Sequence, residues 1–354
     1  MSIYNNILVV ANIDAEQQPA LARAMQIGRK SKSPCKITFF LAIYDFSYEM
    51  TSMLSSDERD AMRAGVIHQR EQWMKEVAAP YHDDNIELDI KVVWHNRPYE
   101  AIISEVFAQD FELVVKTTRK HDVLESVLFT PTDWHLLRKC PCAVLLVKDH
   151  DFPEHGHIVA SVHVGSENEH HLDLNHRMVR KTLDLAERLN ATPHLVNSYP
   201  ITPPNITVEL PEFDPTIYSD SVRGHHLKSM KALRQEYGID EEQTIVEQGL
   251  PQDVIPKAVE DLNAGLVVLG TSGRTGLSAV FLGNTAENII DKINCDVLAL
   301  KPSGYISPLD LTASSHKTLK NSGVSPLFFA SHKRQQSFSL ESDGNIRIIP
   351  LPKV

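Results

Sequence analysis

An internal repeat constrains this chain more than any other feature. Residues 113–149 align without a gap to residues 266–302, at an offset of 266 − 113 = 153, and twelve of the 37 pairs are identical. Two shorter blocks repeat in the same order: Pro98–Ile102 with Pro251–Ile255, and Ile7–Ala11 with Ile158–Val162. Three collinear matches indicate a duplication. We therefore predict two domains, at 1–150 and 155–304.

Both halves carry the pattern of an α/β fold. Short apolar, β-branched runs predict strands buried on both faces of parallel sheets: Ile7–Ile13, Ile37–Ile43, Leu88–Trp94, Leu113–Val115, Val144–Val147, and then Ile158–Val164, His194–Tyr199, Thr244–Gln248, Leu266–Leu269, Val297–Leu300. Helical apolar stripes lie between them, among them Val179, Leu183, Ala186, Leu189, and Leu227, Met230, Leu233, Tyr237. We predict two tandem Rossmann-like domains, each an open five-stranded parallel sheet with helices on both faces.

Two segments lie outside the repeat. Residues 200–217 contain five prolines and no regular pattern, which predicts an ordered surface loop. Residues 305–354 are rich in Ser, Lys and Asn, and we predict a mostly disordered tail with a local strand at Ile346–Ile349.

The charge distribution argues against direct nucleic-acid binding. The net charge is −11, and residues 305–354 contribute +3 from six Lys/Arg and three Asp/Glu, so the remaining residues carry −14. An acidic body repels phosphate backbones. No run of eighteen apolar residues and no export signal are visible, and the four cysteines form no regular framework. We expect a cytoplasmic protein that does not engage membranes.

A glycine-rich stretch in the second half has the pattern of a phosphate site. Gly270 ends a predicted strand, Gly273 follows, and Gly283-Asn284-Thr285 precedes the helical pattern Ala286–Lys292. Glycine lets a ligand approach the backbone and accepts positive φ. N–H groups at a helix N-terminus bind anions. The alternative is a plain strand–helix turn in which Thr285 caps the helix.

This spacing, Gly270, two residues, Gly273, nine residues, Gly283, resembles the ATP-binding signature of the universal stress protein family. The blocks Leu266–Gly276 and Asn294–Leu298, together with the duplication, resemble the tandem type of that family over about 1–304. The resemblance implies the adenine nucleotide alpha hydrolase-like version of the fold, and ATP, with Mg²⁺ where needed, as the ligand. It also implies a role in stress survival through ligand-dependent interaction, with the two domains pairing as family members pair in dimers.

The resemblance places ten residues in the nucleotide site: Ser161, His163, Ser198, Leu269, Gly270, Gly273, Arg274, Gly283, Asn284 and Thr285. The phosphate end matches the family, with Asn284 at its Ser/Thr position. The nucleoside end departs from it, since His163 replaces an Asp that contacts ribose and Ser198 replaces a small apolar residue beside adenine.

In the first half the three glycine positions are Thr117, Lys120 and Thr130, and side chains there would crowd a polyphosphate. We predict a degenerate domain that packs on its partner. A basic mouth for another anion, made of Lys116, Arg119, Lys120 and His121, is the alternative. A lipid-like ligand in that pocket and a scaffold without any ligand also stay open.

The sequence offers no catalytic or metal-binding set. No Gly-Lys-Ser/Thr element is present, and no carboxylate lies within 270–285, so slow ATP hydrolysis is the most that we expect. The histidines at 155, 157, 170, 171, 176, 225 and 226 lack cysteines nearby, and we expect them to be solvated. His95 and Arg97, before a helix start, are secondary site candidates. Whether two chains pair further stays open.

Overall fold

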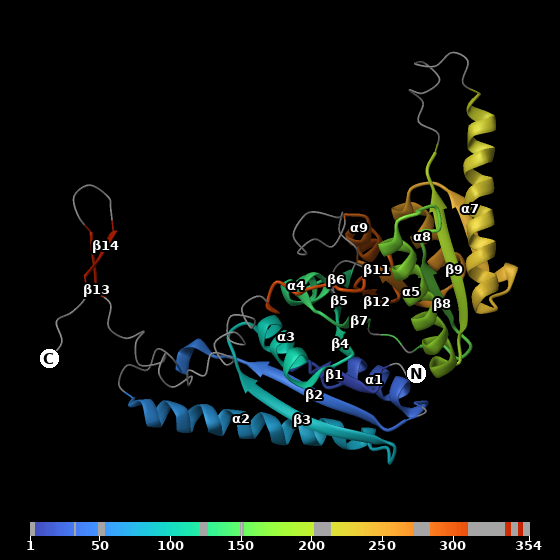
Figure 1. The fold of residues 1–354 in the computed structure, drawn as a ribbon. Helices are drawn as coiled ribbons and strands as arrows, with labels where there is room; N and C mark the ends of the chain where they lie inside the picture. Colours follow the sequence, from blue (N-terminus) through green and yellow to red (C-terminus); the bar gives the residue numbers. More distant parts are fainter. Residues whose placement is uncertain are drawn as a thin grey trace. The chain divides into compact units, whose positions relative to one another are not determined.

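The computed structural model describes residues 4–31, 33–48, 54–120, 127–148, 150, 152–201, 214–271, 284–310, 337–340 and 346–349. The chain divides into two compact units, Met1–Ile306 and Ser307–Val354. Both sequence repeats lie in the first unit (Figure 1). The domain boundary that we place near residues 150–155 therefore stays a prediction.

The first repeat alternates strands and helices, in this order: β1 (Asn6–Val10), α1 (Pro19–Arg29), β2 (Cys35–Ile43), α2 (Ser56–Ala78), β3 (Ile86–Trp94), α3 (Pro98–Gln109), β4 (Leu113–Thr117), β5 (Arg119–Lys120), β6 (Val127–Leu128), α4 (Pro131–Lys139) and β7 (Ala143–Val147). Single 3₁₀ turns follow β2 and α2, at Phe46–Tyr48 and Ala79–Tyr81.

The second repeat follows the same order: β8 (His157–Ser161), α5 (Glu169–Leu189), β9 (Thr192–Tyr199), α7 (Pro215–Tyr237), a 3₁₀ turn (Glu241–Gln243), β10 (Thr244–Gln248), α8 (Pro251–Asp261), β11 (Ala264–Gly270), α9 (Asn284–Lys292) and β12 (Asp296–Leu300). Pro98 and Pro251 are the first residues of α3 and α8, as predicted from the missing proline N–H.

Ten strands form one sheet, in the order β10-β9-β8-β11-β12-β7-β4-β1-β2-β3. Within each repeat the five strands are parallel, and the two repeats join where β7 and β12 pair antiparallel, with Leu146 opposite Val297. The predicted five-stranded parallel sheets are confirmed. The sequence analysis did not foresee that they fuse edge to edge, which covers one edge of each sheet.

All ten predicted apolar runs are strands. Two of these strands end three residues earlier than predicted: Ile7–Ile13 and Ile158–Val164. In both loops a buried amide side chain replaces the neighbouring strand as the backbone's partner. Gln18 accepts the N–H of Asn12 at 2.9 Å, and Asn175 accepts that of His163 at 2.9 Å. Sequence periodicity does not reveal such a substitution, because Gln18 and Asn175 bond through their side chains from 6 and 12 residues further along the chain.

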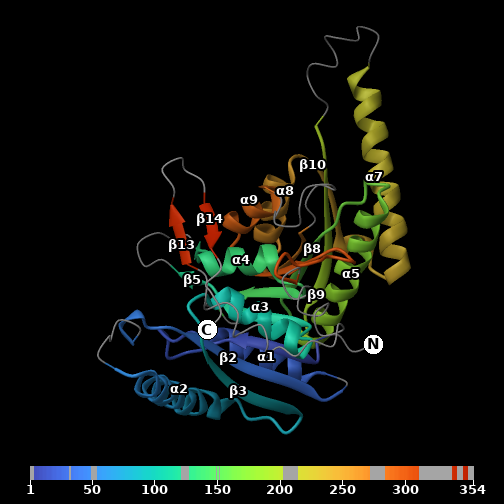
Figure 2. The same cartoon turned by 60° about the vertical axis from the view of Figure 1, so that its left-hand side comes forward.

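Helices cover both faces of the sheet. One face carries a continuous apolar cluster to which α1, α2, α5 and α7 contribute, for example Leu21, Met74, Leu185 and Met230. Buried residues of α3, α4, α8 and α9 lie outside that cluster, and α3 and α4 lie side by side (Figure 2). Strand residues alternate between the layers, so both faces of the parallel strands are buried and the runs read as continuously apolar.

The helix α7 lies along β9 and β10 (Figure 1), and its predicted buried face is partly wrong. Met230 and Leu233 are buried, but Leu227 is 45% exposed, and the buried residue one position earlier is His226. At this point of α7 the buried position is therefore one residue earlier than predicted, and a histidine, His226, occupies it. The helix also begins at Pro215, inside the segment predicted as a loop, and Asp214 caps it.

A buried ion pair joins the two repeats. The Arg23 Nε lies 3.1 Å from Asp296 Oδ2, and both side chains are 4% exposed or less. The other carboxylate oxygen of Asp296 accepts the backbone N–H of Lys148 at 2.9 Å and lies 3.2 Å from His150 Nε2. One carboxylate of the second repeat therefore holds α1 and the residues after β7 of the first.

Two lysines at equivalent positions each bond to the other repeat. Lys148 and Lys301 are related by the repeat offset, 301 − 148 = 153, and both are buried. The Lys148 ammonium donates to the carbonyl of Ile293, just after α9, and the Lys301 ammonium donates to the carbonyl of Leu137 in α4. Each repeat thereby satisfies carbonyls near a helix C-terminus of the other, where a cation is favoured.

The second compact unit contains an antiparallel pair, β13 (Ser337–Leu340) and β14 (Ile346–Ile349). The strand predicted at Ile346–Ile349 is confirmed. Most of 305–354 lies outside the described residues, so the predicted disorder stays a prediction. Among the helices that the structure describes, none is both long and apolar enough to cross a bilayer.

Candidate functional site

The predicted site residues of the second repeat lie at one edge of the sheet. Because β8, β9 and β11 are parallel, their carboxyl ends meet at the same edge, which is where open α/β sheets bind ligands. Ser161 ends β8, Ser198 is the last but one residue of β9, and Leu269 and Gly270 end β11. Gly273, Arg274 and Gly283 lie outside the described residues, and their place in the site stays a prediction.

The strand register places three of these side chains on one layer. Val268 pairs with Ala160, so the next residues, Leu269 and Ser161, lie beside each other. Val268 and Ala160 belong to the apolar cluster on the face of the sheet that α1, α2, α5 and α7 cover. Because successive side chains of a strand point to opposite faces, Leu269 and Ser161 point to the other face, which α8 and α9 cover. Ser198 falls on the same face of β9, two residues after the partner of Ser161. Leu269 is buried, whereas both hydroxyls are half-buried.

Gly270 has a packing role that the sequence analysis did not predict. Among the described glycines, positive φ occurs only at Gly238, Gly249 and Gly304, so Gly270 does not need a left-handed backbone. A Cβ at Gly270 would instead lie 2.6 Å from Leu174 Cδ2 and 3.4 Å from Met178 Sδ. The absent side chain lets α5 pack closely on the end of β11, which is a helix–sheet contact, and the place of Gly270 in the ligand site stays a prediction.

The helix α9 begins beside this edge. It runs from Asn284 to Lys292, so Asn284 and Thr285 form its first turn instead of preceding it. The helix leads into β12, whose first residue pairs with Leu266 at the start of β11, and its N-terminus therefore lies at the carboxyl edge. Thr285 is exposed there. First-turn N–H groups at this position can bind an anion.

His163 occupies the loop between β8 and α5. Asn175, which is 3% exposed, accepts the His163 N–H and donates to the His163 carbonyl, both at 2.9 Å. These two hydrogen bonds fix the backbone of His163. Its imidazole lies at the surface, with its ring centroid 5.4 Å from that of His171. Loss of hydration, and then the nearby His171, lower the pKa of His163. At neutral pH its ring is therefore a neutral hydrogen-bonding group.

A second buried amide holds the following residue. Asn197, 1% exposed on β9, accepts the N–H of Val164 at 3.1 Å, and its amide nitrogen lies 2.9 Å from Nδ1 of His226. His226 is 6% exposed, so the expectation that this histidine is solvated is wrong. Its neighbour His225 is exposed, as expected. Among the described residues no group of three or more His, Cys, Asp or Glu is arranged to hold a metal ion.

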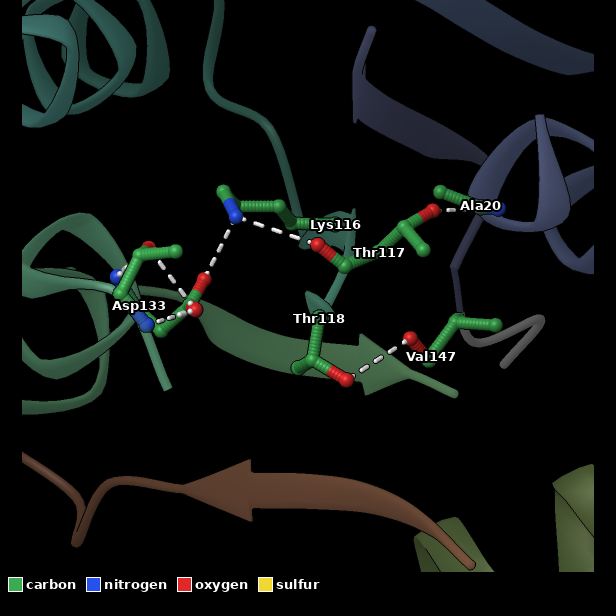
Figure 3. A network of polar contacts seen from close by, with 7 residues as sticks. Ala20, Lys116, Thr117, Thr118, Asp133 and Val147 are labelled. Carbon is green, nitrogen blue, oxygen red and sulfur yellow. Dashed lines mark hydrogen bonds and ion pairs between the residues drawn. The ribbon is translucent and has the colours of Figure 1, made fainter. Parts of the chain in front are cut away.

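The equivalent edge of the first repeat is closed by its own side chains (Figure 3). Thr117, at the position of Gly270, accepts the N–H of Ala20 in the first turn of α1 at 3.1 Å. The Thr118 N–H donates to the carbonyl of Val147 at 2.8 Å, as the Thr271 N–H does to that of Leu300. The Thr118 hydroxyl donates to the same Val147 carbonyl at 3.4 Å (Figure 3), and the Thr271 hydroxyl to that of Leu300 at 3.0 Å. The two repeats thus share the backbone turn after the fourth strand and differ in the side chain before it.

At the start of α4, side chains of the first repeat bond to one another. Thr130 caps α4 and forms a capping box with Asp133, whose carboxylate accepts the N–H of Thr130 at 2.7 Å. The Lys116 ammonium lies 2.7 Å from the other oxygen of the fully buried Asp133 (Figure 3). A carboxylate with its own cation therefore stands where an anion would bind. Lys116 is engaged, which removes it from the basic mouth considered above. The side chains of Arg119 and Lys120, and all of His121, lie outside the described residues.

In the second repeat the same positions lack these groups. Leu269 replaces Lys116, Gly283 replaces Thr130 and Ala286 replaces Asp133. The start of α9 consequently cannot form the capping box or the ion pair that fill the start of α4. His95 and Arg97 are engaged locally: His95 Nδ1 accepts the Arg97 N–H at 3.0 Å, and Arg97 pairs with Glu100 at 2.8 Å.

Sequence reasoning missed three residues that shape the site, Asn175, Asn197 and His226. Two of them left a signal. Asn175 lies four residues before Val179 and so extends the predicted apolar stripe of α5, and Asn197 interrupts the apolar run of β9. A polar residue at a buried position requires a partner. His226 left no such signal, because the predicted apolar stripe of α7 placed the neighbouring Leu227 at the buried position.

Comparison with known proteins agrees with this architecture. A family model described as "Universal stress protein family" matches residues 3–148 and again 171–301. Universal stress protein E from Salmonella typhi is 55% identical over 312 residues, which is 88% of this chain and 98% of that protein. Universal stress protein E from Escherichia coli K12 is 54% identical over the same shares, and the homolog from Haemophilus influenzae is 45% identical over 303 residues, 85% of this chain and 98% of that one.

Solved structures show the same fold. A functionally unknown protein from Pseudomonas aeruginosa PAO1 superimposes with a TM-score of 0.67 at 28% identity, covering 88% of this chain and 98% of its own. A universal stress protein from Archaeoglobus fulgidus superimposes with a TM-score of 0.54 at 13% identity, covering 85% and 98%. The predicted resemblance to a tandem-type member is confirmed by the two family matches on one chain.

Proposed function

The chain belongs to the universal stress protein family, and from that membership we propose that its second repeat binds ATP or a related nucleotide while its first repeat does not. The nucleotide phosphates would lie against the N–H groups at the start of α9 and the loop from Gly270 to Gly283. The nucleoside would lie toward Ser161, His163 and Ser198. Arg274 would add a positive charge to the phosphate end.

One contrast carries this proposal, namely the difference between the starts of α4 and α9. In α4 the anion position holds the Asp133 carboxylate, which is neutralised by Lys116 and capped with Thr130. In α9 the equivalent residues are Ala286, Leu269 and Gly283. At α4 the Asp133 carboxylate accepts the N–H of the cap residue Thr130, and the Thr130 hydroxyl accepts the first-turn N–H of Asp133. An external phosphate would supply the oxygen acceptors that the start of α9 lacks.

The described residues fit a nucleotide better than a directly bound metal ion. The site residues among them are hydroxyl, imidazole, amide or apolar, and none is a carboxylate. Mg²⁺ prefers oxygen ligands and keeps several waters when it accompanies phosphates. Mg²⁺ would therefore enter with the nucleotide. The residues that we name bind and orient the ligand, and the proposal assigns none of them a catalytic role.

We place this function in the cytoplasm, in stress survival, with the bound state signalling to a protein partner. The four cysteines, Cys35, Cys140, Cys142 and Cys295, are free thiols, three of them buried, which suits a reducing compartment. The repeats already pair with each other through β7 and β12. Pairing of two whole chains would need another surface.

The test is ATP titration of the full chain by calorimetry, with one substitution in each repeat at aligned positions. Gly273→Val places a branched side chain in the proposed phosphate loop, and we expect it to weaken ATP binding by at least about tenfold, equivalent to ~1.4 kcal/mol. Lys120→Val makes the matched change in the first repeat, since 273 − 120 = 153. We expect it to leave the affinity unchanged.

The opposite pattern, with affinity lost in Lys120→Val and kept in Gly273→Val, would move the site to the first repeat. Absence of binding at millimolar ATP in the unsubstituted chain would support the scaffold alternative. Folding of each variant is checked by its thermal unfolding without nucleotide, so that a loss of affinity is not a loss of structure.

A further inference from the structure

A chain of three buried groups links the helix α7 to the loop after β8. The Val164 N–H donates to Asn197 Oδ1 at 3.1 Å, and Asn197 Nδ2 lies 2.9 Å from His226 Nδ1. Asn197 and His226 are 1% and 6% exposed, so water does not readily replace either bond. The groups come from a loop, from β9 and from α7, and no two of them are close in sequence.

The geometry fixes the direction of each bond. A backbone N–H can only donate, so the Asn197 atom that faces Val164 must be the carbonyl oxygen. The amide nitrogen of Asn197 then faces His226 and donates, because that nitrogen has no acceptor capacity. His226 Nδ1 must accept, and the neutral imidazole must carry its proton on Nε2. A protonated His226 would present an N–H to the Asn197 amide nitrogen, and turning the amide over would only move the clash to Val164.

Packing leaves the imidazole little room to move away from this bond. A Cβ placed at Gly165 would lie 2.2 Å from Cε1 and 2.5 Å from Nε2 of His226, so the ring lies directly against the loop backbone. On another side the ring of Tyr199 lies with its centroid 5.5 Å away. Gly165 is therefore the residue that lets the imidazole contact the loop.

We propose that Val164, Asn197 and His226 form a proton-sensitive clip that holds the β8–α5 loop and positions His163, and that protonation of His226 releases this loop. The inference rests on the proposed function in one respect, since it makes the clip a regulator of the nucleoside end of that site. His226 and Asn197 act as positioning residues, because neither needs to touch the ligand. Acidification would then weaken nucleotide binding through α7.

The surroundings of His226 oppose its protonation until the pH falls. Burial is the first cause that lowers its pKa, followed by His225 on the same helix and His163 on the loop. Among the described residues, Tyr199 from β9 is a further titratable group against the ring. Since the folded pKa lies below the ordinary value near ~6.5, the clip is intact above that pH. The clip is lost as the pH falls through the lowered pKa that His226 has in the folded protein.

The experiment follows the clip directly, by NMR of the full chain. Long-range ¹H–¹⁵N spectra report which nitrogen of His226 carries the proton, and hydrogen exchange reports the protection of the Val164 amide, corrected for its intrinsic rate. We expect the Nε2–H form near neutral pH. In a titration downward from about pH 7.5, we expect Val164 protection to fall by about tenfold as His226 takes up its second proton, which corresponds to the loss of one neutral hydrogen bond. His226→Gln keeps an acceptor that does not titrate, and its Val164 protection should not change with pH.

His225→Gln is the matched control, on the adjacent exposed position. It should keep the loss of Val164 protection on acidification, with the transition moved to higher pH, because His225 no longer lowers the pKa of His226. A neutral His226 with its proton on Nδ1, or Val164 protection that stays constant while His226 titrates, would overturn the clip without any variant. ATP affinity over the same pH range separates the two proposals. If ATP fails to bind at any pH, the proposed function fails and hydrogen exchange still decides the clip. If ATP binds with the same pH dependence in His226→Gln, the regulatory link is refuted.

Discussion

Asp296→Ala is expected to lower the free energy of unfolding by about 3–5 kcal/mol, because it removes the buried carboxylate that pairs with the buried Arg23 guanidinium. Arg23 and Asp296 are 4% and 1% exposed at their side chains, and their atoms lie 3.1 Å apart. The substitution also removes the acceptor of the Lys148 N–H. Guanidinium chloride unfolding measures the change.

The control is Asp253→Ala, which removes an ion pair of similar length, 2.7 Å to Lys292, with side chains 61% and 50% exposed. Solvent screens that pair, and we expect a loss of at most about 1 kcal/mol. A double substitution, Arg23→Met with Asp296→Leu, should recover most of the stability, since no lone charge then stays buried. Equal effects of Asp296→Ala and Asp253→Ala would show that the buried pair does not hold the two repeats together.

Gly270→Val should lower the free energy of unfolding by about 1–3 kcal/mol through overpacking. The missing Cβ at Gly270 leaves room for Leu174, whose Cδ2 would lie 2.6 Å from it, and for Met178. Both neighbours are buried in the core cluster and can move little. Thermal and denaturant unfolding measure the loss, and ATP affinity, measured alongside, shows whether the close approach of α5 matters to the site.

A double-mutant cycle identifies the cause. Gly270→Val combined with Leu174→Ala should be less destabilised than the sum of the single losses, by about 0.5–3 kcal/mol, because the smaller residue makes room for the valine. Gly224→Val, on α7, is the control, since nothing lies within 4 Å of its missing Cβ, and it should change stability by no more than about 0.5 kcal/mol. Strict additivity at Gly270 and Leu174 would mean that the glycine serves something other than this contact.

The strands and helices were predictable because their buried residues leave a regular apolar pattern in the sequence. Parallel strands buried on both faces read as apolar runs, and a duplication let each half check the other, so all ten strands were found. The junction of β7 with β12 was not predictable, because edge pairing depends on which strand lies last in each sheet. The same holds for Lys148 and Lys301, which look like ordinary surface lysines in sequence and are buried only once the repeats meet.

The position of the candidate site at the sheet edge was predictable, whereas Gly273 and Gly283 stay predictions because they lie outside the described residues. The carboxyl edge does gather Ser161, Ser198, Leu269 and Gly270, as parallel topology requires. The packing of Leu174 and Met178 against Gly270 was not predictable, since a glycine at a strand end has the same sequence signature whether a ligand or a helix approaches it. The amide and imidazole contacts that shape the loop join residues 29 and 33 positions apart, which no local pattern encodes.

Native mass spectrometry of the full chain with ATP tests the central claim most directly, because it counts bound ligands per polypeptide. One nucleotide should add to each chain, and none to Gly273→Val, while Lys120→Val should still take up one. Two nucleotides per chain would contradict the closure of the first repeat by Lys116 and Asp133. No nucleotide on the unsubstituted chain would contradict the site at the start of α9.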